Sequence, residues 1–361
     1  MSEPSELPVG ELDRIVSALV GLARDRGATS AQLATLGGVW AEHQAAALSG
    51  ATAPGLSDRA AGLAADLLGV DALLAPANAP YGGFWQEAEA AVTSSGAVTP
   101  PPRSVERAEL VVFDPEDPTP DWAALAAHGL TGPLRFVDAC AVIEALARVV
   151  APGPYLQTIS LLPALPGDER ERVADGESSW ALAIGPLVLA LDSATSVAIV
   201  GGDGIFELVG ADRELLATRD LTRPLGVVIG GDAGRRLGDS TSLPLVRRRL
   251  LTGLAFEALG VIDAIEPTSP AGAARALADE AARRVEADDP EADQFAAAAK
   301  ALACDLAFEI STAAIAKAAA DSSVELARLH ERARSIRAWE ASPAHLRTEI
   351  GETLLERGGD E

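Results

Sequence analysis

One stretch of the chain, Leu243–Ile265, constrains the fold most. It predicts a long helix in which glycines on one face lower the stability of the helix. Its apolar residues recur at three- and four-residue spacing, and prolines follow its end. Gly253 and Gly260 share a face with Glu257. A glycine inside a helix costs about 1 kcal/mol relative to alanine. Something must therefore approach this face closely: either another helix, with Glu257 at the edge of the contact, or a flat ligand toward which Glu257 points.

The composition favours closely packed helices around a large core. Of the 361 residues, 48% are hydrophobic but only 4% are aromatic, so alanine and leucine have to fill the interior. The net charge of −24 argues against nucleic acid and against anionic membrane surfaces as partners. A basic run, Arg247 to Arg249, leaves two alternatives open: a nucleotide-binding patch, or an exposed triplet among acidic neighbours.

Residue usage and the N-terminus indicate a cytoplasmic protein without a metal site. Cys140 and Cys304 lie in alanine-rich helical surroundings and are too few for a disulfide framework, so each is expected to be a small core residue. The histidines and cysteines show no close spacing typical of metal ligands. The acidic N-terminus lacks an apolar targeting run, and the longest apolar stretch is too short to cross a bilayer.

The patterns along the chain are helical, then β, then helical. Residues 9–48 predict two helices, 57–68 a third, and 93–104 a linker rich in glycine, proline and serine. From Ser179 to Ile229, five short apolar runs predict an antiparallel sheet or small barrel. Gly201–Gly204 predicts a hairpin turn rather than a phosphate loop, because a strand-like run follows it. Further helices are expected near 244–265, 271–287, 291–318, 322–339 and 343–356.

Several stretches in this order resemble the acyl-CoA dehydrogenase family. They are DWAALAAHGLTG at 121–132, IEALARVVAPGPYL at 143–156, ATRDLTRPLGVVIGG at 217–231, LTGLAFEALGVIDA at 251–264 and LHERARS at 329–335. The resemblance implies an α+β fold with an N-terminal helical domain, a central antiparallel β-domain and a C-terminal helical bundle. The expected domains are 105–176, 177–242 and 243–361, after a helical extension of unknown role at 1–104.

The resemblance also implies a chemistry, the α,β-dehydrogenation of an acyl-CoA thioester. In the family a glutamate removes the α-proton while the flavin of FAD takes the β-hydride. In one branch that glutamate lies at the position matched here by Glu257, which is the expected catalytic base. In another branch it lies later in the chain, where the nearest match is Glu325, but the polar surroundings of Glu325 favour a solvated side chain.

Two departures from the family pattern put flavin binding by this chain alone in doubt. The family's arginine and glutamine motif for the flavin pyrophosphate is replaced by Glu266–Gly272, and its Gly-Gly pair by Ala318–Asp321. No cofactor-binding residue can therefore be assigned, and FAD is expected to be shared with, or held by, a second acyl-CoA dehydrogenase-like subunit. Two alternatives stay open: a non-catalytic structural subunit, and a pseudoenzyme that binds an acyl thioester without flavin.

Overall fold

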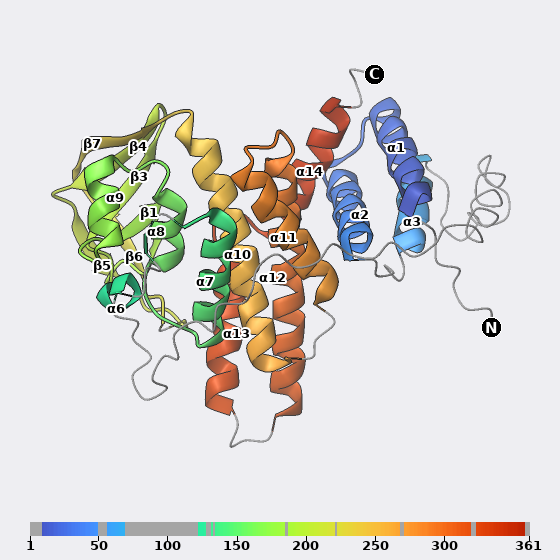
Figure 1. Ribbon diagram of the computed structural model, residues 1–361. Helices are drawn as coiled ribbons and strands as arrows, with labels where there is room; N and C mark the ends of the chain where they lie inside the picture. Colours follow the sequence, from blue (N-terminus) through green and yellow to red (C-terminus); the bar gives the residue numbers. More distant parts are fainter. Residues whose placement is uncertain are drawn as a thin grey trace.

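The computed structural model describes residues 9–49, 56–68, 122–127, 131–132, 134–184, 187–220, 222–267, 271–318 and 323–357. The linker expected at 93–104 lies outside these residues. Three groups of elements follow one another across the molecule (Figure 1). The N-terminal helices lie at one end, the strands lie at the other, and the long C-terminal helices run between them.

The C-terminal helices confirm the prediction from periodicity, and each end lies within two residues of the expected position. They are α10 (Ser242–Ile265), α11 (Gly272–Glu286), α12 (Ala292–Lys317), α13 (Ser323–Ala338) and α14 (Pro343–Arg357). Helix α10 packs on α12 on one side and on α7 (Phe136–Arg148) on the other. It is thus the central helix of the molecule.

The glycine face of α10 is filled by other helices, which decides between the two alternatives for it. A Cβ atom at Gly260 would overlap the backbone oxygen of Glu144 in α7. At Gly253 it would overlap Leu156 in α8 (Tyr155–Leu161). Close helix packing, rather than a flat ligand, therefore accounts for both glycines.

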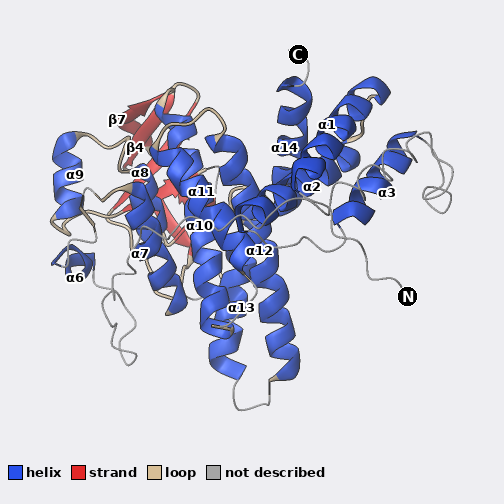
Figure 2. Cartoon of the chain, turned by 45° about the vertical axis from the view of Figure 1, so that its right-hand side comes forward, coloured by secondary structure: helices blue, strands red, loops and turns tan. Residues whose placement is uncertain are grey.

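Two small sheets form the β-region, and Figure 2 shows them beyond the helices α7 and α8. One has the order β1-β3-β4-β7, and the other has the order β2-β6-β5. The strands are β1 (Trp180–Ala183), β2 (Leu187–Leu189), β3 (Ser196–Gly201), β4 (Gly204–Val209), β5 (Asp212–Leu215), β6 (Leu225–Ile229) and β7 (Asp232–Asp239). The predicted hairpin turn is confirmed, since Gly201 pairs with Gly204.

The strand pairing corrects the sequence prediction in two respects. All pairs are antiparallel except β1 with β3, which is parallel because β2, between them in the chain, belongs to the other sheet. The exposed strands β5 and β7 were not predicted, because charged residues fill DREL and DAGRRLGD and leave no apolar run. The helices that lead into the sheets are α6 (Trp122–Ala127), α7, α8 and α9 (Gly167–Ala174).

The N-terminal helices pack on the last helix of the chain. They are α1 (Val9–Arg26), α2 (Ser30–Ser49) and α3 (Leu56–Leu68), and α2 crosses α14 (Figure 1). At the crossing, a Cβ atom on Gly37 would overlap the backbone oxygen of Arg347, and one on Gly351 would overlap that of Leu33. The two backbones therefore touch, so the described part of the N-terminal extension shares a core with the C-terminal helices.

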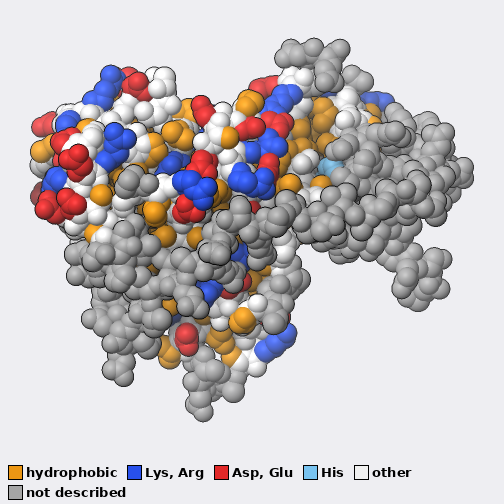
Figure 3. Space-filling view, in the orientation of Figure 1, with side chains coloured by type: hydrophobic (Ala, Val, Ile, Leu, Met, Phe, Trp, Pro, Cys, Tyr) orange, Lys and Arg blue, Asp and Glu red, His pale blue; other side chains and the backbone are white. Residues whose placement is uncertain are grey.

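Four further features bear on the expected function. Acidic and basic side chains lie next to one another across the face in Figure 3, and both cysteines are buried and unbridged as expected. Within the described residues, no helix has the length and apolar character needed to cross a bilayer. The same residues hold no cluster of three or more His, Cys, Asp or Glu side chains suited to a metal ion.

The crossing of α2 and α14 can be tested with a pair of glycine substitutions. Gly351→Ala forces a methyl group against the backbone of Leu33, and we expect a loss of about 1–3 kcal/mol, typical of overpacking. Gly21→Ala in α1 is the control, because no heavy atom lies within 4 Å of the added carbon and alanine favours the helix. Denaturant titration measures both; a Gly351→Ala variant as stable as the wild type would contradict the crossing.

Candidate functional site

Glu257, the predicted catalytic residue, lies in the middle of α10 with 0% of its side chain exposed. Both carboxylate oxygens are paired. Arg332 Nη1 donates to Oε1 at 2.8 Å, and Arg223 Nη1 donates to Oε2 at 2.9 Å. The hydroxyl of Tyr155 also donates to Oε1, at 3.0 Å. The buried carboxylate is therefore neutralised by two guanidinium groups, because a buried charge needs a partner of opposite sign.

A second carboxylate, Asp220, completes the arrangement. It pairs with Arg332 Nε at 3.1 Å and accepts a hydrogen bond from Ser335 at 2.9 Å. Ser335 in turn accepts from Arg223 Nη2 at 2.9 Å. We call these side chains the Glu257 cluster: Tyr155, Asp220, Arg223, Glu257, Arg332 and Ser335. It contains two arginines and two carboxylates, so it is formally neutral.

The cluster joins elements that are far apart in the sequence. Glu257 comes from α10, Tyr155 from α8, and Arg332 and Ser335 from α13, while Asp220 and Arg223 come from the loop between β5 and β6. The side chains of Arg223 and Arg332 are 1% and 0% exposed. The cluster thus ties the loop between β5 and β6 to three helices by charge, in addition to the apolar core that the strands share with the helices.

Burial and charge shift the pKa values of three groups in the cluster, so that Tyr155 stays a neutral donor while Asp220 and Arg332 stay charged. Burial raises the pKa of Tyr155, and the neighbouring Glu257 raises it further, so the phenol stays protonated and donates. Burial opposes ionisation of Asp220, but Arg332 and Arg223 outweigh it and lower the pKa of Asp220 to about 2. Burial likewise lowers the pKa of Arg332, but Tyr155 and the two carboxylates reverse this and raise it above its usual value.

The turn between α13 and α14 holds another buried carboxylate, Glu340, which sequence reasoning missed. Its side chain is 7% exposed, and its backbone has φ 67°, a conformation that costs non-glycine residues energy. Oε1 pairs with Arg247 at 2.9 Å, while Oε2 has no hydrogen-bond partner among the described residues. The buried Lys300 holds the turn by donating to the carbonyl oxygens of Trp339 and Ala341, on either side of Glu340.

The other candidates from the sequence are placed as follows. Glu325 is exposed in the first turn of α13, as its polar surroundings predicted.

The basic run, Arg247 to Arg249, is not an exposed triplet. Arg247 pairs with Glu340 and Glu349, Arg248 pairs with Asp288 and Asp293, and Arg249 lies over the ring of Phe136. Acidic neighbours are therefore confirmed for Arg247 and Arg248, but exposure is not, because acidic residues between the turn after α11 and helix α14 pack on this part of α10.

The partners of Glu257 were also missed, although a signal for them existed. A carboxylate predicted among apolar residues on a central helix needs a cation, since lone charges are almost never fully buried. Arg223 and Arg332 lie in two of the stretches that carry the family resemblance. Their sequence separations from Glu257, 34 and 75 residues, kept spacing arguments from connecting them.

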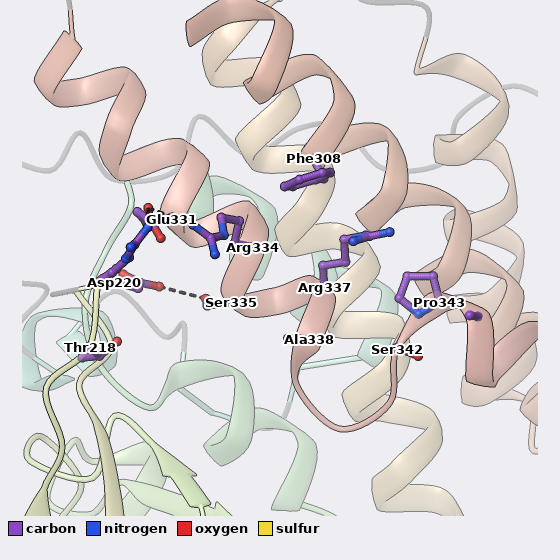
Figure 4. A pocket seen from close by; sticks show the side chains of 12 residues that line it. Thr218, Asp220, Phe308, Glu331, Arg334, Ser335, Arg337, Ala338, Ser342 and Pro343 are labelled. Carbon is purple, nitrogen blue, oxygen red and sulfur yellow. Dashed lines mark hydrogen bonds and ion pairs between the residues drawn. The ribbon is translucent and has the colours of Figure 1, made fainter.

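A pocket of about 570 Å³ opens beside the Glu257 cluster, and Figure 4 shows its lining. We call it the arginine pocket, because Arg219, Arg334 and Arg337 line it. Asp220 and Ser335 belong to both pocket and cluster, and the dashed line in Figure 4 marks their hydrogen bond. The remaining lining residues are Thr218, Phe308, Glu331, Ala338, Ser342, Pro343 and Ala344.

A smaller pocket of about 260 Å³ lies next to the β-region. Trp122 and Tyr155 line it together with Ser193 and Thr195. The indole Nε1 of Trp122 is buried without a hydrogen-bond partner among the described residues, so a polar ligand atom would have a donor there. Among the described residues, no cationic side chain lines this pocket.

FAD needs both donors for its pyrophosphate and a flat apolar slot for its ring system. Among the described lining residues, the arginine pocket supplies cations but a single aromatic ring, Phe308, and the smaller pocket of about 260 Å³ has aromatic lining but no cation. Neither pocket, as the described residues line it, therefore combines the pyrophosphate donors with the aromatic slot that the whole cofactor needs. The described residues of this chain therefore give no basis for a flavin-dependent step.

Comparison with solved structures gives the fold. The model matches butyryl-CoA dehydrogenase from Megasphaera elsdenii with a TM-score of 0.52 at 14% identity, over 66% of this chain and 89% of that chain. An acyl-CoA dehydrogenase from Slackia heliotrinireducens matches with 0.52 at 13% identity, over 68% and 91%. A steroid ACAD variant named Tcur3481-Tcur3483 matches with 0.50 at 18%, over 66% and 89%.

These likenesses confirm the expected α+β fold of the acyl-CoA dehydrogenases, with N-terminal helices, central β-sheets and a C-terminal helical domain. No protein-family model matches the sequence, and no curated protein matches it. At these identities the likeness shows the fold alone, so activity, cofactor and partner are matters for proposal.

Removing the charge of Glu257 is expected to lower the free energy of unfolding. In Glu257→Gln the two guanidinium groups keep only Asp220 as a buried counter-charge, and breaking a buried pair costs about 3–5 kcal/mol. The control is Glu325→Gln on the exposed first turn of α13, expected within about 0.5 kcal/mol of the wild type. Denaturant titration compares them, and equal stability of the two variants would contradict the role of the cluster.

The low pKa of Asp220 predicts an acid limb in the stability profile. Its folded-state value of about 2 lies below the usual 3.8, so the unfolded state binds more protons between these values. The contribution, about 2 kcal/mol, is therefore complete above pH 4 and disappears as the pH falls toward 2.

Asp220→Asn isolates this contribution. The variant is expected to be less stable at neutral pH, because Arg332 and Arg223 lose their partner, and to lose less stability on acidification than the wild type. Asp192→Asn, which changes an exposed carboxylate, is the control. Urea titrations from pH 6 to pH 2 measure the difference, and parallel acid limbs in the wild type and Asp220→Asn would overturn the assignment.

Proposed function

We propose that this chain is an acyl-CoA dehydrogenase-like subunit that acts with an unlike, flavin-binding subunit on an acyl-CoA thioester. The observation that carries the proposal is an acyl-CoA dehydrogenase fold in which neither pocket, as lined by the described residues, fits FAD. A further support is the steroid ACAD Tcur3481-Tcur3483, whose name joins two proteins. In this proposal FAD is held by the partner or at the contact between the two subunits.

The proposed reaction removes the α-proton and the β-hydride of the thioester. The α-proton is a weak acid, so its base has to be positioned and free to accept it. Glu257 is the base predicted from the sequence, and this role stays a prediction. Both of its oxygens hold guanidinium groups, so it would have to give up an ion pair with Arg223 or Arg332 before it could accept a proton.

A non-catalytic structural subunit is the second candidate, and the closed Glu257 cluster favours it. A carboxylate that is 0% exposed and paired on both oxygens is suited to fixing the relative positions of α8, α10, α13 and the β-region. The partner would then supply both base and flavin. Glu340, buried and with one oxygen unpaired, is the other described carboxylate to compare with Glu257 in this respect.

Purification tests the partnership. Expressed alone, the chain is expected to be colourless; co-expressed with an acyl-CoA dehydrogenase-like chain from the same genome, it is expected to co-purify with that chain and with bound flavin. The two flavin absorption bands and a denaturing gel give the readout. Stoichiometric flavin in the chain purified alone would overturn the proposal, and so would failure of every such chain to co-purify.

The assembled complex then separates the two candidates. Turnover of an acyl-CoA is measured per assembled complex in Glu257→Gln and Glu340→Gln, so that a stability loss is not mistaken for a catalytic one. Loss of turnover with intact assembly in Glu257→Gln supports the predicted base. Full turnover in both variants assigns the chemistry to the partner and leaves this chain a structural role.

The remaining expectations from the sequence belong to the same proposal. A cytoplasmic location agrees with the acidic composition and with the finding that no described helix could cross a bilayer. The domain boundaries at 104, 176 and 242 also stay predictions.

A further inference from the structure

Helix α12 ends in an exposed ridge of charged and small side chains. Residues four apart lie on one side of a helix, so Glu309, Ala313 and Lys317 form a single row. All three are exposed, as is Ala316 beside them. Here α12 and α13 extend past the end of α10, as Figure 1 shows. We call Glu309, Ala313, Ala316 and Lys317 the α12 ridge.

The two charged members of the ridge are unpaired. Glu309 and Lys317 have no hydrogen-bond or ion-pair partner among the described residues. One turn earlier on the same helix, Asp305 pairs with both Arg337 and Arg347. Glu309 and Lys317 lie about 12 Å apart along the axis, too far for a contact within one helix. Charges of opposite sign therefore wait for a partner at each end of the ridge.

Lysine is rare in this chain, which sets Lys317 apart. The sequence has two lysines, Lys300 and Lys317. Lys300 is 0% exposed and donates to the carbonyl oxygens of Trp339 and Ala341. Lys317 therefore carries the one exposed ε-amine of the chain, on a flexible stem that can reach a carboxylate of another molecule.

The order of residues along the ridge is self-complementary. In a two-fold contact, residue i of one copy meets residue j of the other, and j meets i. When two copies of α12 cross antiparallel at Ala313, Glu309 of each copy lies beside the partner's Lys317, because both are four residues from the crossing. A parallel crossing would instead set each charged residue against its own copy. The ridge thus selects the antiparallel arrangement.

The centre of the ridge permits the two helices to approach. Ala313 lies at the crossing, and Ile310 lies opposite the partner's Ala316 in the same arrangement. Ile310 is half-buried against the core of its own chain, so part of its side chain stays available for this contact. The distance between helix axes depends on the side chains at the contact, and alanines keep it short. The contact therefore has an apolar centre with an ion pair at each end, as protein interfaces do.

We propose that two copies of the chain associate through the α12 ridge, with Glu309 of each copy paired to the partner's Lys317. Exposed ion pairs add little affinity but fix register and orientation, so the association is expected to be weak and reversible. The net charge of −24 on each copy opposes it, although salt at about 0.15 M screens charges beyond about 8 Å. The inference does not rest on the proposed function, because the unlike subunit takes no part in this contact.

Analytical ultracentrifugation of the chain alone, at this salt concentration and over a wide range of protein concentrations, tests the proposal. The wild type is expected to shift reversibly from monomer to dimer as its concentration rises. In Glu309→Lys two lysines meet at each end of the contact, and in Lys317→Glu two glutamates meet. The dissociation constant is therefore expected to rise by about tenfold or more in each. The double variant Glu309→Lys/Lys317→Glu restores both pairs and is expected to regain the wild-type affinity.

The matched control is Glu352→Lys, which changes an exposed carboxylate on α14. Like Glu309→Lys, it replaces one acid by one base and reduces the repulsion between two acidic copies. If net charge alone governed association, both variants would dimerise more readily than the wild type. The ridge predicts weaker association for Glu309→Lys and an affinity no lower than that of the wild type for Glu352→Lys.

Chemical cross-linking gives an independent readout. A carbodiimide joins an amine directly to a carboxylate as an amide and takes up the water that is lost. It is expected to link Lys317 of one copy to the partner's Glu309, which gives a dimer on a denaturing gel and a linked peptide in mass spectrometry. The same link cannot form within one helix, because about 12 Å separates the two residues along the axis.

Four results would overturn the proposal. They are a wild type that stays monomeric at every concentration, unchanged affinity in Glu309→Lys or Lys317→Glu, a double variant as weak as the single ones, and a cross-linked dimer in which Lys317 is joined to other carboxylates instead of Glu309. A thermal melt of each variant, expected to lie close to the wild type because the altered side chains are exposed, shows that lost association is not unfolding.

Discussion

The buried pairing of Arg223 and Arg332 with Asp220 and Glu257 is the interaction on which the arrangement of this molecule depends. Taking an ion out of water costs several kcal/mol, and the cost is offset only when every charge has a partner in good geometry. The elements that carry these side chains are therefore expected to pack together with all four charges paired. The pairs tie the loop between β5 and β6 to α10 and α13, and Tyr155 adds α8.

The rest of the interior is built from residues small enough to let helix axes approach. With 4% aromatic residues, the chain fills its core mainly with alanine and leucine, and α12 alone buries a long run of alanines. Glycines allow the closest contacts, at Gly260 against α7 and at Gly351 against α2. Packing of this kind tolerates little change in volume, which agrees with the high density of protein interiors.

Much of the fold could be predicted from local signals. The five C-terminal helices follow from helical periodicity ended by proline and glycine, and the hairpin at Gly201 follows from its turn residues. What local signals could not give is pairing between distant segments. The parallel pair β1 with β3 depends on where β2 goes, and the charged strands β5 and β7 carry no apolar alternation to detect.

The same limit applies to the site. The sequence identified Glu257 and its glycine face, but the arginines that pair with it come from two other regions of the chain. Arg247 and Arg248 were expected to be exposed for the same reason, since their acidic partners follow 40 or more residues later. The net charge of −24 is an average over the whole chain, so it could not reveal the local group of Arg219, Arg334 and Arg337 around one pocket.

The contact of α2 with α14 has a consequence for synthesis. The backbone of Leu33 meets that of Gly351, so the first helices finish their packing only when the last helix has left the ribosome. Until then the side of α2 that meets α14 stays uncovered, although α1, α3, α11 and α12 pack on its other sides. Long-range contacts of this kind slow folding. A chaperone that binds emerging helices would therefore act on the N-terminal helices of this protein. In a nascent chain stalled before residue 343, the side of α2 that meets α14 would stay exposed.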